Sequence, residues 1–285
     1  YGDRVEIRYV MGGLVEDITT LFNLEVPKSQ IIEQANRLIA DDLLAASAIH
    51  GMPVVTNDMH LYTEQYSSSY PQNIAYHAAR RIDPTAAKIF LRRMREATFT
   101  ECKRTSQIDV LIELANEAGI ESAEFINHYT DSNPQTDFAS DRMMCRRNGI
   151  TGFPSYLIKS DSTYIILCGY QKLSSLQSAI SRLSRDKIRP RRIGPSLANL
   201  MDFIKRYKRV YPKEIEVCFS LDENQALLMI NTLSQNHRIH ITPIGNSSCI
   251  SPLQSKQTLS QSLHNTFSQS KDNTKAKAFT TSQKE

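Results

Sequence analysis

The 285-residue sequence lacks several features that would assign a protein to a class directly. It has no run of about 18 apolar residues, so no segment is predicted to span a membrane. It also has no G-x-S-x-G, no phosphate-cradling glycine loop and no H-E-x-x-H. No methionine precedes Tyr1, so we expect a processed or truncated product, from which a targeting segment or a first element is missing.

Cysteine is scarce and its spacing shows no pattern. The five cysteines include no C-x-x-C and no spacing typical of metal ligands. This favours a reducing compartment, the cytoplasm, over a disulfide framework or a zinc site. The five are Cys102, Cys145, Cys168, Cys218 and Cys249.

Composition is that of an ordinary globular protein, with 40% hydrophobic and 22% charged residues. The length is sufficient for a sizeable core, in one large domain or two smaller ones. A formal net charge of +4 allows a nucleic-acid partner without implying one.

The stretch from Cys145 to Ile158 predicts a helix end followed by the opening of a strand. Gly149 is predicted to stop the helix and Gly152 to lie in the turn that follows. Pro154 precedes an apolar run, and proline is tolerated at the first residue of a strand because it has no N–H to donate.

Before that stretch, the sequence predicts one strand and then a series of helices. Residues 5–10 alternate apolar and polar side chains and predict a strand, which the Gly12-Gly13 pair closes as a turn. Residues 52–69 have no clear period and predict a long loop, a kind of segment that is often functional. The predicted helices are 29–50, one from Pro71, 83–101, one from about Ser106 to Gly119, 121–130 and 134–148.

After Ile158, a polar turn at residues 160–162 leads to the apolar run 163–168, so the two runs predict an antiparallel β-hairpin. A helix over 172–183 follows. Residues 184–195 are basic and predict a linker. A helix (196–208), a strand (214–219), a helix (222–233) and a strand (238–244) then predict a small α+β unit over 196–250, whose order resembles a winged-helix arrangement. Residues 251–285 are polar and predict a disordered tail.

This order resembles the DsbA-like branch of the thioredoxin superfamily, over about residues 1–183 with a helical insertion at about 30–148. The most specific motif is the Gly-Phe-Pro element at 152–154, ahead of the hairpin. The cytosolic bacterial members are the most similar. Their helical region carries the pattern seen here as Gly51-Met-Pro53, Ser68-Ser-Tyr-Pro71 and Phe90-Leu-Arg-Arg-Met-Arg-Glu96. The fold class expected from this resemblance is α/β: a thioredoxin-like fold with a large all-helical insertion, plus the small C-terminal α+β unit.

The resemblance implies a substrate-binding role for Gly152, Phe153 and Pro154. In thioredoxin folds the proline is cis, and the residue before it presents its backbone to an extended peptide. Since only about 5–6% of X-Pro bonds are cis, the sequence alone would not predict this isomer. No metal or organic cofactor is implied.

The sequence departs from the family at the redox centre. A C-x-x-C at a helix N-terminus, where a thiolate is stabilised, is absent from residues 1–285. We expect it upstream of Tyr1, which would make the full product a disulfide oxidoreductase or isomerase acting on protein or peptide thiols, and this chain alone inactive. The alternative is a non-catalytic peptide-binding adaptor, for example for a protease.

Two further hypotheses concern thiols and basic residues. Cys145 and Cys168 are interpreted as small packing residues rather than redox thiols. The basic residues of 189–192 and 205–213 suggest a phosphate-contacting face on the C-terminal unit, although a solvated basic face is the commoner explanation of such a pattern. Nucleic-acid binding is therefore the weakest of the three functional hypotheses.

Overall fold

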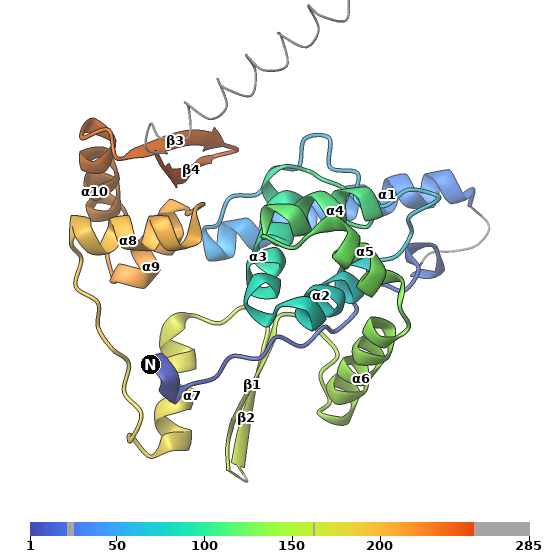
Figure 1. Cartoon of the computed structure of the whole chain (residues 1–285), viewed down its shortest axis with the longest axis horizontal. Helices are drawn as coiled ribbons and strands as arrows, with labels where there is room; N and C mark the ends of the chain where they lie inside the picture. The colour runs from blue at the N-terminus through green and yellow to red at the C-terminus, as the bar shows by residue number, and fades with distance from the viewer. Residues whose placement is uncertain (22–25, 162, 254–285) are drawn as a thin grey trace, which may run out of the picture.

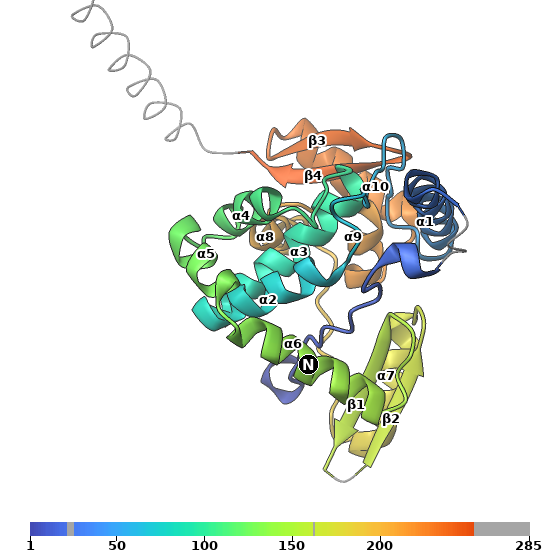
Figure 2. The same cartoon turned by 90° about the vertical axis from the view of Figure 1, so that its right-hand side faces the viewer.

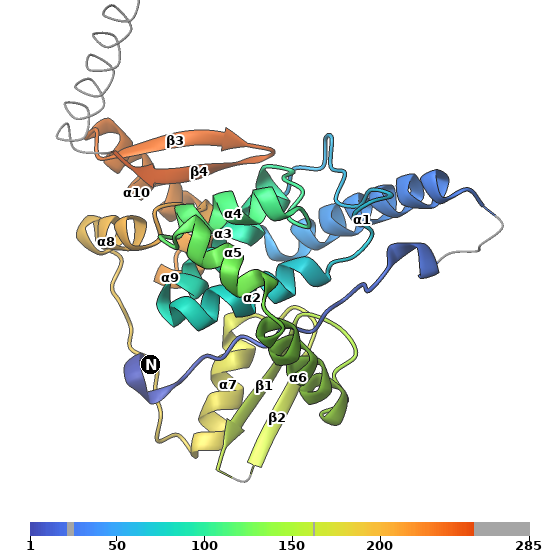
Figure 3. The same cartoon turned by 45° about the vertical axis from the view of Figure 1, so that its right-hand side comes forward.

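A computed structural model of the chain describes residues 1–21, 26–161 and 163–253. Ser162, in the predicted turn, and residues 254–285, most of the predicted tail, lie outside the described residues. Figures 1 to 3 show three parts: a block of helices, a β-hairpin with one helix beside it, and a C-terminal group of helices with a second hairpin. No helix among the described residues combines the length and apolarity needed to cross a bilayer.

The helical block contains α1 to α6. Two short 3-10 helices, Gly2–Arg4 and Ile18–Leu21, precede it. Its helices are α1 (Lys28–His50), α2 (Tyr70–Ile82), α3 (Pro84–Thr100), α4 (Ile108–Glu117), α5 (Ser122–Thr130) and α6 (Asn133–Arg147). Each of the predicted helices is present within one or two residues of its expected ends, and residues 52–69 form neither helix nor strand, as predicted.

Helix ends in this block follow from local chemistry. Asp83 precedes α3, and its carboxylate accepts hydrogen bonds from the backbone N–H groups of Thr85 and Ala86. Pro84 occupies the first helical position, where a missing N–H has no consequence. The core beneath consists of side chains at helical spacing, with Phe90, Leu111, Leu114 and Phe125 at 0% exposure. Burial of such a side chain contributes about 1.5–3 kcal/mol.

The predicted hairpin is present as β1 (Ser155–Ser160) and β2 (Thr163–Cys168). The strands are antiparallel, with Ser155 opposite Cys168 and Leu157 opposite Ile166. Helix α7 (Leu173–Ser184) packs beside both strands (Figure 3). Among the described residues, β1 has β2 as its strand neighbour on one edge and no strand on the other.

The predicted strand over residues 5–10 is wrong. These residues are irregular, because a strand needs a neighbouring strand to satisfy its N–H and C=O groups and none lies beside them in the described chain. Side chains hold the segment instead. Tyr9 packs edge-on against Tyr76 of α2, with ring centroids 6.4 Å apart.

The C-terminal unit, residues 196–253, has three helices followed by a hairpin. The elements are α8 (Leu197–Tyr207), α9 (Pro212–Phe219), α10 (Glu223–Gln235), β3 (Ile239–Ile244) and β4 (Ser247–Pro252). An isolated antiparallel bridge joins Val210, between α8 and α9, to Ile250 of β4. The resemblance to a winged-helix arrangement stays a prediction. The apolar core of this unit, which includes Leu200, Ile204, Ile215 and Ile250, is separate from that of the helical block.

Two predictions for this unit are wrong. Residues 214–219 were expected to form a strand but form most of α9. Pro212 starts the helix and Glu214 accepts from the Tyr211 N–H in a capping box, while Ile215 and Phe219, four apart, are buried. The predicted tail also begins too early, because Ser251 and Pro252 belong to β4, a strand that pairs with β3.

Candidate functional site

The Phe153–Pro154 dipeptide lies where α6 gives way to β1. Helix α6 ends in a turn in which the Ile150 N–H donates to the Cys145 carbonyl at 2.9 Å, and Gly149 has a φ of +66°. The Phe153–Pro154 peptide bond is cis. The Pro154 carbonyl accepts from the Gly169 N–H at 2.8 Å, which extends the hairpin ladder by one pair.

Both the ring and the backbone groups of Phe153 are available for contact with a bound peptide. The side chain is 42% exposed although it is large and apolar. Neither its backbone N–H nor its C=O has a hydrogen-bond partner within the described residues. An extended peptide could therefore pair with this backbone in the manner of an added strand.

The Phe153 ring packs directly against Gly12. A Cβ built at Gly12 would overlap three atoms of that ring. From the sequence, the pair Gly12-Gly13 was predicted only as a turn that ends a strand, so its contact with Phe153 was not predicted. The available signal was the pair of adjacent glycines, since glycine marks places of close approach as well as turns.

A glycine is also required at position 13, both by its backbone conformation and by the side chains beside it. Its φ is +69°, and an added Cβ would lie 2.6 Å from Cζ of Phe138 and 3.0 Å from Cε1 of Tyr70. Gly152, by contrast, has nothing within 4 Å of an added Cβ. The substrate-binding role of Gly152, Phe153 and Pro154 stays a prediction, and these residues lie together just before β1.

A buried contact between an aspartate and a histidine lies beside the segment that carries Gly12. Asp141 of α6 is 2% exposed, and its carboxylate lies 3.1 Å from Nε2 of the fully buried His77 of α2. The Met11 N–H donates to the same carboxylate at 2.9 Å, and Arg8 reaches it at 3.5 Å. Burial raises the pKa of Asp141, but the bonds from His77 and Met11 outweigh burial, so its pKa is below the usual value. The contact between His77 and Asp141 was not predicted from the sequence.

The cysteines are not arranged for redox chemistry with one another. All five are free. Burial raises the pKa of Cys145 and Cys249, and that of the half-buried Cys102, which disfavours the thiolate that attacks disulfides, whereas Cys218 is exposed. Cys145 is buried at 6% exposure, as its interpretation as a packing residue requires. Cys168 is exposed at the end of β2, so its interpretation as a packing residue is wrong.

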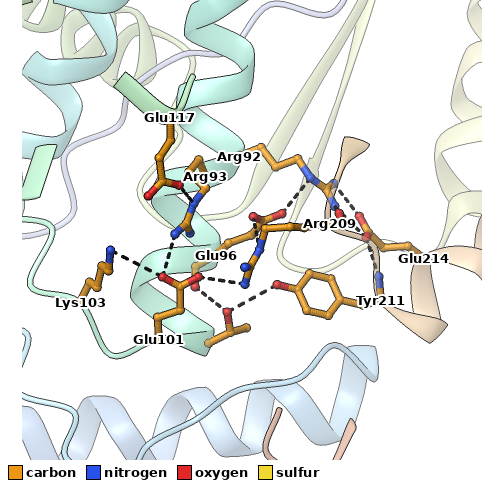
Figure 4. A network of polar contacts seen from close by, with 10 residues as sticks. Arg92, Arg93, Glu96, Glu101, Lys103, Glu117, Arg209, Tyr211 and Glu214 are labelled. Atoms are coloured by element: carbon orange, nitrogen blue, oxygen red, sulfur yellow. Dashed lines mark hydrogen bonds and ion pairs between the residues drawn. The ribbon is translucent and has the colours of Figure 1, made fainter. Parts of the chain in front are cut away.

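A network of charged side chains joins the helical block to the C-terminal unit (Figure 4). At its centre, the Arg92 guanidinium of α3 donates to both carboxylate oxygens of Glu214, at 2.7 and 2.9 Å. Arg92 also donates to the Arg209 carbonyl at 2.6 Å. Arg209 in turn reaches Glu96 at 3.1 Å and Glu101 at 2.9 Å.

The same network extends along α3 to α4. Arg93 pairs with Glu101 and Glu117, and Lys103 reaches Glu101 at 3.9 Å. Glu96 is buried, and its burial raises its pKa although Arg92 and Arg209 act in the opposite direction. The network comprises four cations and five carboxylates, since Lys103 also pairs with Glu113 at 2.7 Å. Its members are Arg92, Arg93, Lys103, Arg209, Glu96, Glu101, Glu113, Glu117 and Glu214.

Two of the five basic side chains of residues 205–213, which belong to the predicted phosphate-contacting face, form ion pairs. Arg209 belongs to the network just described, and Lys213 pairs with Glu216 and lies against Gly51 at the end of α1. Arg206 lies over the Tyr207 ring, with 5.6 Å from Cζ to the ring centroid. Lys205, Arg206 and Lys208 are exposed, so the phosphate-contacting face stays a prediction.

Comparisons with known proteins agree with the arrangement of the chain. A family model described as Thioredoxin matches residues 1–175. The chain is 24% identical over 247 residues to the ClpXP adapter protein SpxH of Halalkalibacterium halodurans, covering 86% of this chain and 77% of that protein. Because the family match ends at residue 175, this similarity must extend into the C-terminal part.

Two solved structures are also similar. One is of a putative protein disulfide isomerase from Nitrosomonas europaea, with 15% identity and a TM-score of 0.49 over 54% of this chain and 76% of that chain. The other is of the cytosolic disulfide reductase DsbM from Pseudomonas aeruginosa, with 20% identity and a TM-score of 0.45 over 58% and 76%.

Proposed function

Since the chain belongs to the thioredoxin family, we propose that it is a peptide-binding adaptor that uses this fold to hold an extended segment of a client protein. The observation that carries the proposal is the half-exposed Phe153, fixed on Gly12 at the opening of β1. Its backbone groups have no partner in the described chain, and the adjacent edge of β1 has no strand beside it there. A client strand would gain main-chain hydrogen bonds at this edge and an aromatic contact at Phe153.

The role of adaptor is further supported by the thiols and by sequence similarity. Cys145 and Cys249 are buried and Cys102 is half-buried, which disfavours the thiolate form of these three. The similarity to a ClpXP adapter covers both the thioredoxin part and the C-terminal part. The client would accordingly be a protein presented to a protease of that kind, in a reducing cytoplasm where the five cysteines stay free.

The second candidate function is thiol–disulfide exchange on protein or peptide substrates, and family membership favours it. That chemistry needs a thiolate beside the bound peptide, and residues 1–285 contain no C-x-x-C. Residues 1–285 are therefore expected not to accelerate insulin reduction by dithiothreitol. Clear acceleration would favour this second candidate over the adaptor.

A peptide-array experiment tests the adaptor. The full chain is applied to an array of extended peptides, and the best binder is fused to a fluorescent protein as a probe. We expect Phe153→Glu to weaken binding of that probe at least about tenfold, a loss of about 1.4 kcal/mol. Tyr164→Glu is the matched control, since Tyr164 is a 60%-exposed aromatic residue on the other strand of the same hairpin. With purified ClpXP, the chain should accelerate degradation of the probe, and Phe153→Glu should abolish that acceleration.

Equal binding by wild type and Phe153→Glu would contradict the placement of the peptide. Binding without accelerated degradation would leave a peptide-binding protein but remove the protease from the proposal.

A further inference from the structure

Helix α10 has an exposed face with two leucines. The residues of this face recur at helical spacing, and Leu227 and Leu228 are 40% and 68% exposed. The face comprises Asn224, Leu227, Leu228, Asn231 and Gln235. On the opposite side, Ala226, Ile230 and Leu233 are buried in the core of the C-terminal unit. Figure 1 shows α10 at the outer edge of the molecule, on the side of the unit away from the helical block.

The charge of this face excludes a nucleic-acid partner. In a winged-helix arrangement, α10 is in the position of the helix that enters the DNA major groove. Affinity for DNA comes largely from lysine and arginine on phosphates. None of the 13 residues of α10 is lysine or arginine, and Asp222 and Glu223 at its N-terminal end are acidic and exposed. A phosphate backbone would therefore be repelled at one end of the face and unattracted along the rest.

We propose that the exposed face of α10 binds the apolar side of an amphipathic helix of a protein partner, with a basic residue of that helix beside Asp222 and Glu223. Two leucines one residue apart, flanked by asparagines and a glutamine, offer an apolar contact with uncharged hydrogen-bonding groups around it. Because every backbone N–H in the middle of a helix is already bonded, a partner cannot add itself here as a strand and must dock through side chains. The acidic end then sets the sign of the complementary charge.

This surface is separate from the proposed peptide site. Helix α10 lies outside residues 1–175, which the family match covers, and far along the chain from Phe153. A result at α10 therefore neither supports nor contradicts the binding of an extended peptide at β1.

The test uses the full chain and three fluorescein-labelled synthetic helices of about five turns, each held helical by a hydrocarbon staple. All three carry the same leucine stripe, and their ends bear lysine, glutamine or glutamate. Fluorescence anisotropy gives each dissociation constant, and a labelled duplex DNA is measured in parallel. We expect the lysine-ended helix to bind most tightly, and Leu228→Glu or Leu227→Glu to weaken it at least about tenfold.

Ile89→Glu is the matched control, because Ile89 is a 46%-exposed apolar residue on α3. It should leave binding within about twofold of wild type. Circular dichroism of each variant checks that the fold is retained, and Leu228→Ala gives a milder variant if a glutamate unfolds the unit.

Each of the following results would overturn the proposal. They are no binding of any helix, tightest binding of the glutamate-ended helix, insensitivity to Leu227 and Leu228, and salt-dependent DNA binding that these substitutions abolish. Dimerisation of the chain that Leu228→Glu abolishes in sedimentation would also overturn it, since a second copy would then be the occupant.

Discussion

Position 12 can hold no residue other than glycine without a rearrangement, because the Phe153 ring fills the space where a Cβ would lie. We expect Gly12→Ala to destabilise the protein by about 1–3 kcal/mol, the usual consequence of overpacking. The displaced ring should also weaken peptide binding. Urea denaturation measures the first effect and the peptide probe the second.

Gly152→Ala is the control for that substitution. Gly152 immediately precedes Phe153 in the chain, but an added Cβ there meets nothing within 4 Å. Its stability should change by less than about 0.5 kcal/mol. If both alanines behaved alike, the contact between Phe153 and Gly12 would not be the cause.

Asp141 is expected to make stability depend on acid. Its pKa is lowered in the folded protein, so its ionised form contributes stability that is full above its unfolded pKa and is lost as pH falls through the folded pKa. Wild type should thus lose stability as the pH falls below about 4. Asp141→Asn should cost about 1–3 kcal/mol at neutral pH, because it replaces the buried carboxylate that faces His77 and accepts from the Met11 N–H, and should flatten the acid dependence.

Thermal denaturation across a pH series measures both effects. Asp137→Asn is the control, since Asp137 is a partly exposed partner of Arg81 one turn earlier on α6. Its cost should be within about 1 kcal/mol. A steep acid transition that persisted in Asp141→Asn would assign the dependence to other carboxylates.

At the scale of elements, α3 contacts α9 through a bidentate ion pair. Arg92 donates to both oxygens of Glu214, and Glu214 also caps α9. Arg92→Met should destabilise the protein by about 3–5 kcal/mol, because it leaves carboxylates partly buried without a counter-charge. Adding Glu214→Gln should restore about 1–3 kcal/mol of that loss, which a double-mutant cycle measures.

Arg92→Lys keeps the positive charge but loses the planar guanidinium that donates two parallel hydrogen bonds. The stability of this variant should therefore lie between those of wild type and Arg92→Met. The exposed pair of Arg37 and Glu33 on α1 gives the reference cycle, with a coupling of less than about 1 kcal/mol. Strict additivity of Arg92→Met and Glu214→Gln would show that the two side chains do not interact in solution.

Elements defined by neighbours in the sequence were predicted well, and those defined by distant neighbours were not. Helix α3 follows from Asp83, Pro84 and the apolar spacing after them, and the β1–β2 hairpin from two apolar runs with a polar turn. Residues 5–10 and 214–219 both alternate like strands, yet the first has no partner strand and the second is started as a helix by Pro212 and its capping box.

The candidate site divides in the same way. Pro154 and Phe153 could be predicted from a local motif that resembles a known family. Gly12 and the pair of His77 and Asp141 could not, because each depends on residues that are far apart in the chain and meet only after folding. A residue that determines the structure of its own neighbours in the chain can be predicted from the sequence pattern. A residue whose role depends on a side chain far away in the sequence cannot.

At the scale of the whole molecule, the helical block and the C-terminal unit have separate apolar cores and a charged interface. We expect them to unfold in one transition, because the interface carries several partly buried ion pairs. Calorimetry of the full chain should show one peak, with equal calorimetric and van't Hoff enthalpies.

Arg92→Met should separate the peak into two, since it removes the bidentate contact between the parts while leaving each core intact. Arg81→Met, which affects a pair within the helical block, should keep a single peak. Two peaks in the wild type would show that the ion pairs do not couple the parts.

The bidentate contact also limits how such a chain can change over generations. A substitution of Arg92 alone leaves Glu214 without its counter-charge, and a substitution of Glu214 alone leaves Arg92 without one. Each single substitution is therefore expected to lower stability, whereas replacement of both residues together is tolerated. Positions 92 and 214 are therefore expected to change together in descendants of this sequence, and the record of which pairs they have adopted would show how long the two halves have been inherited as one protein.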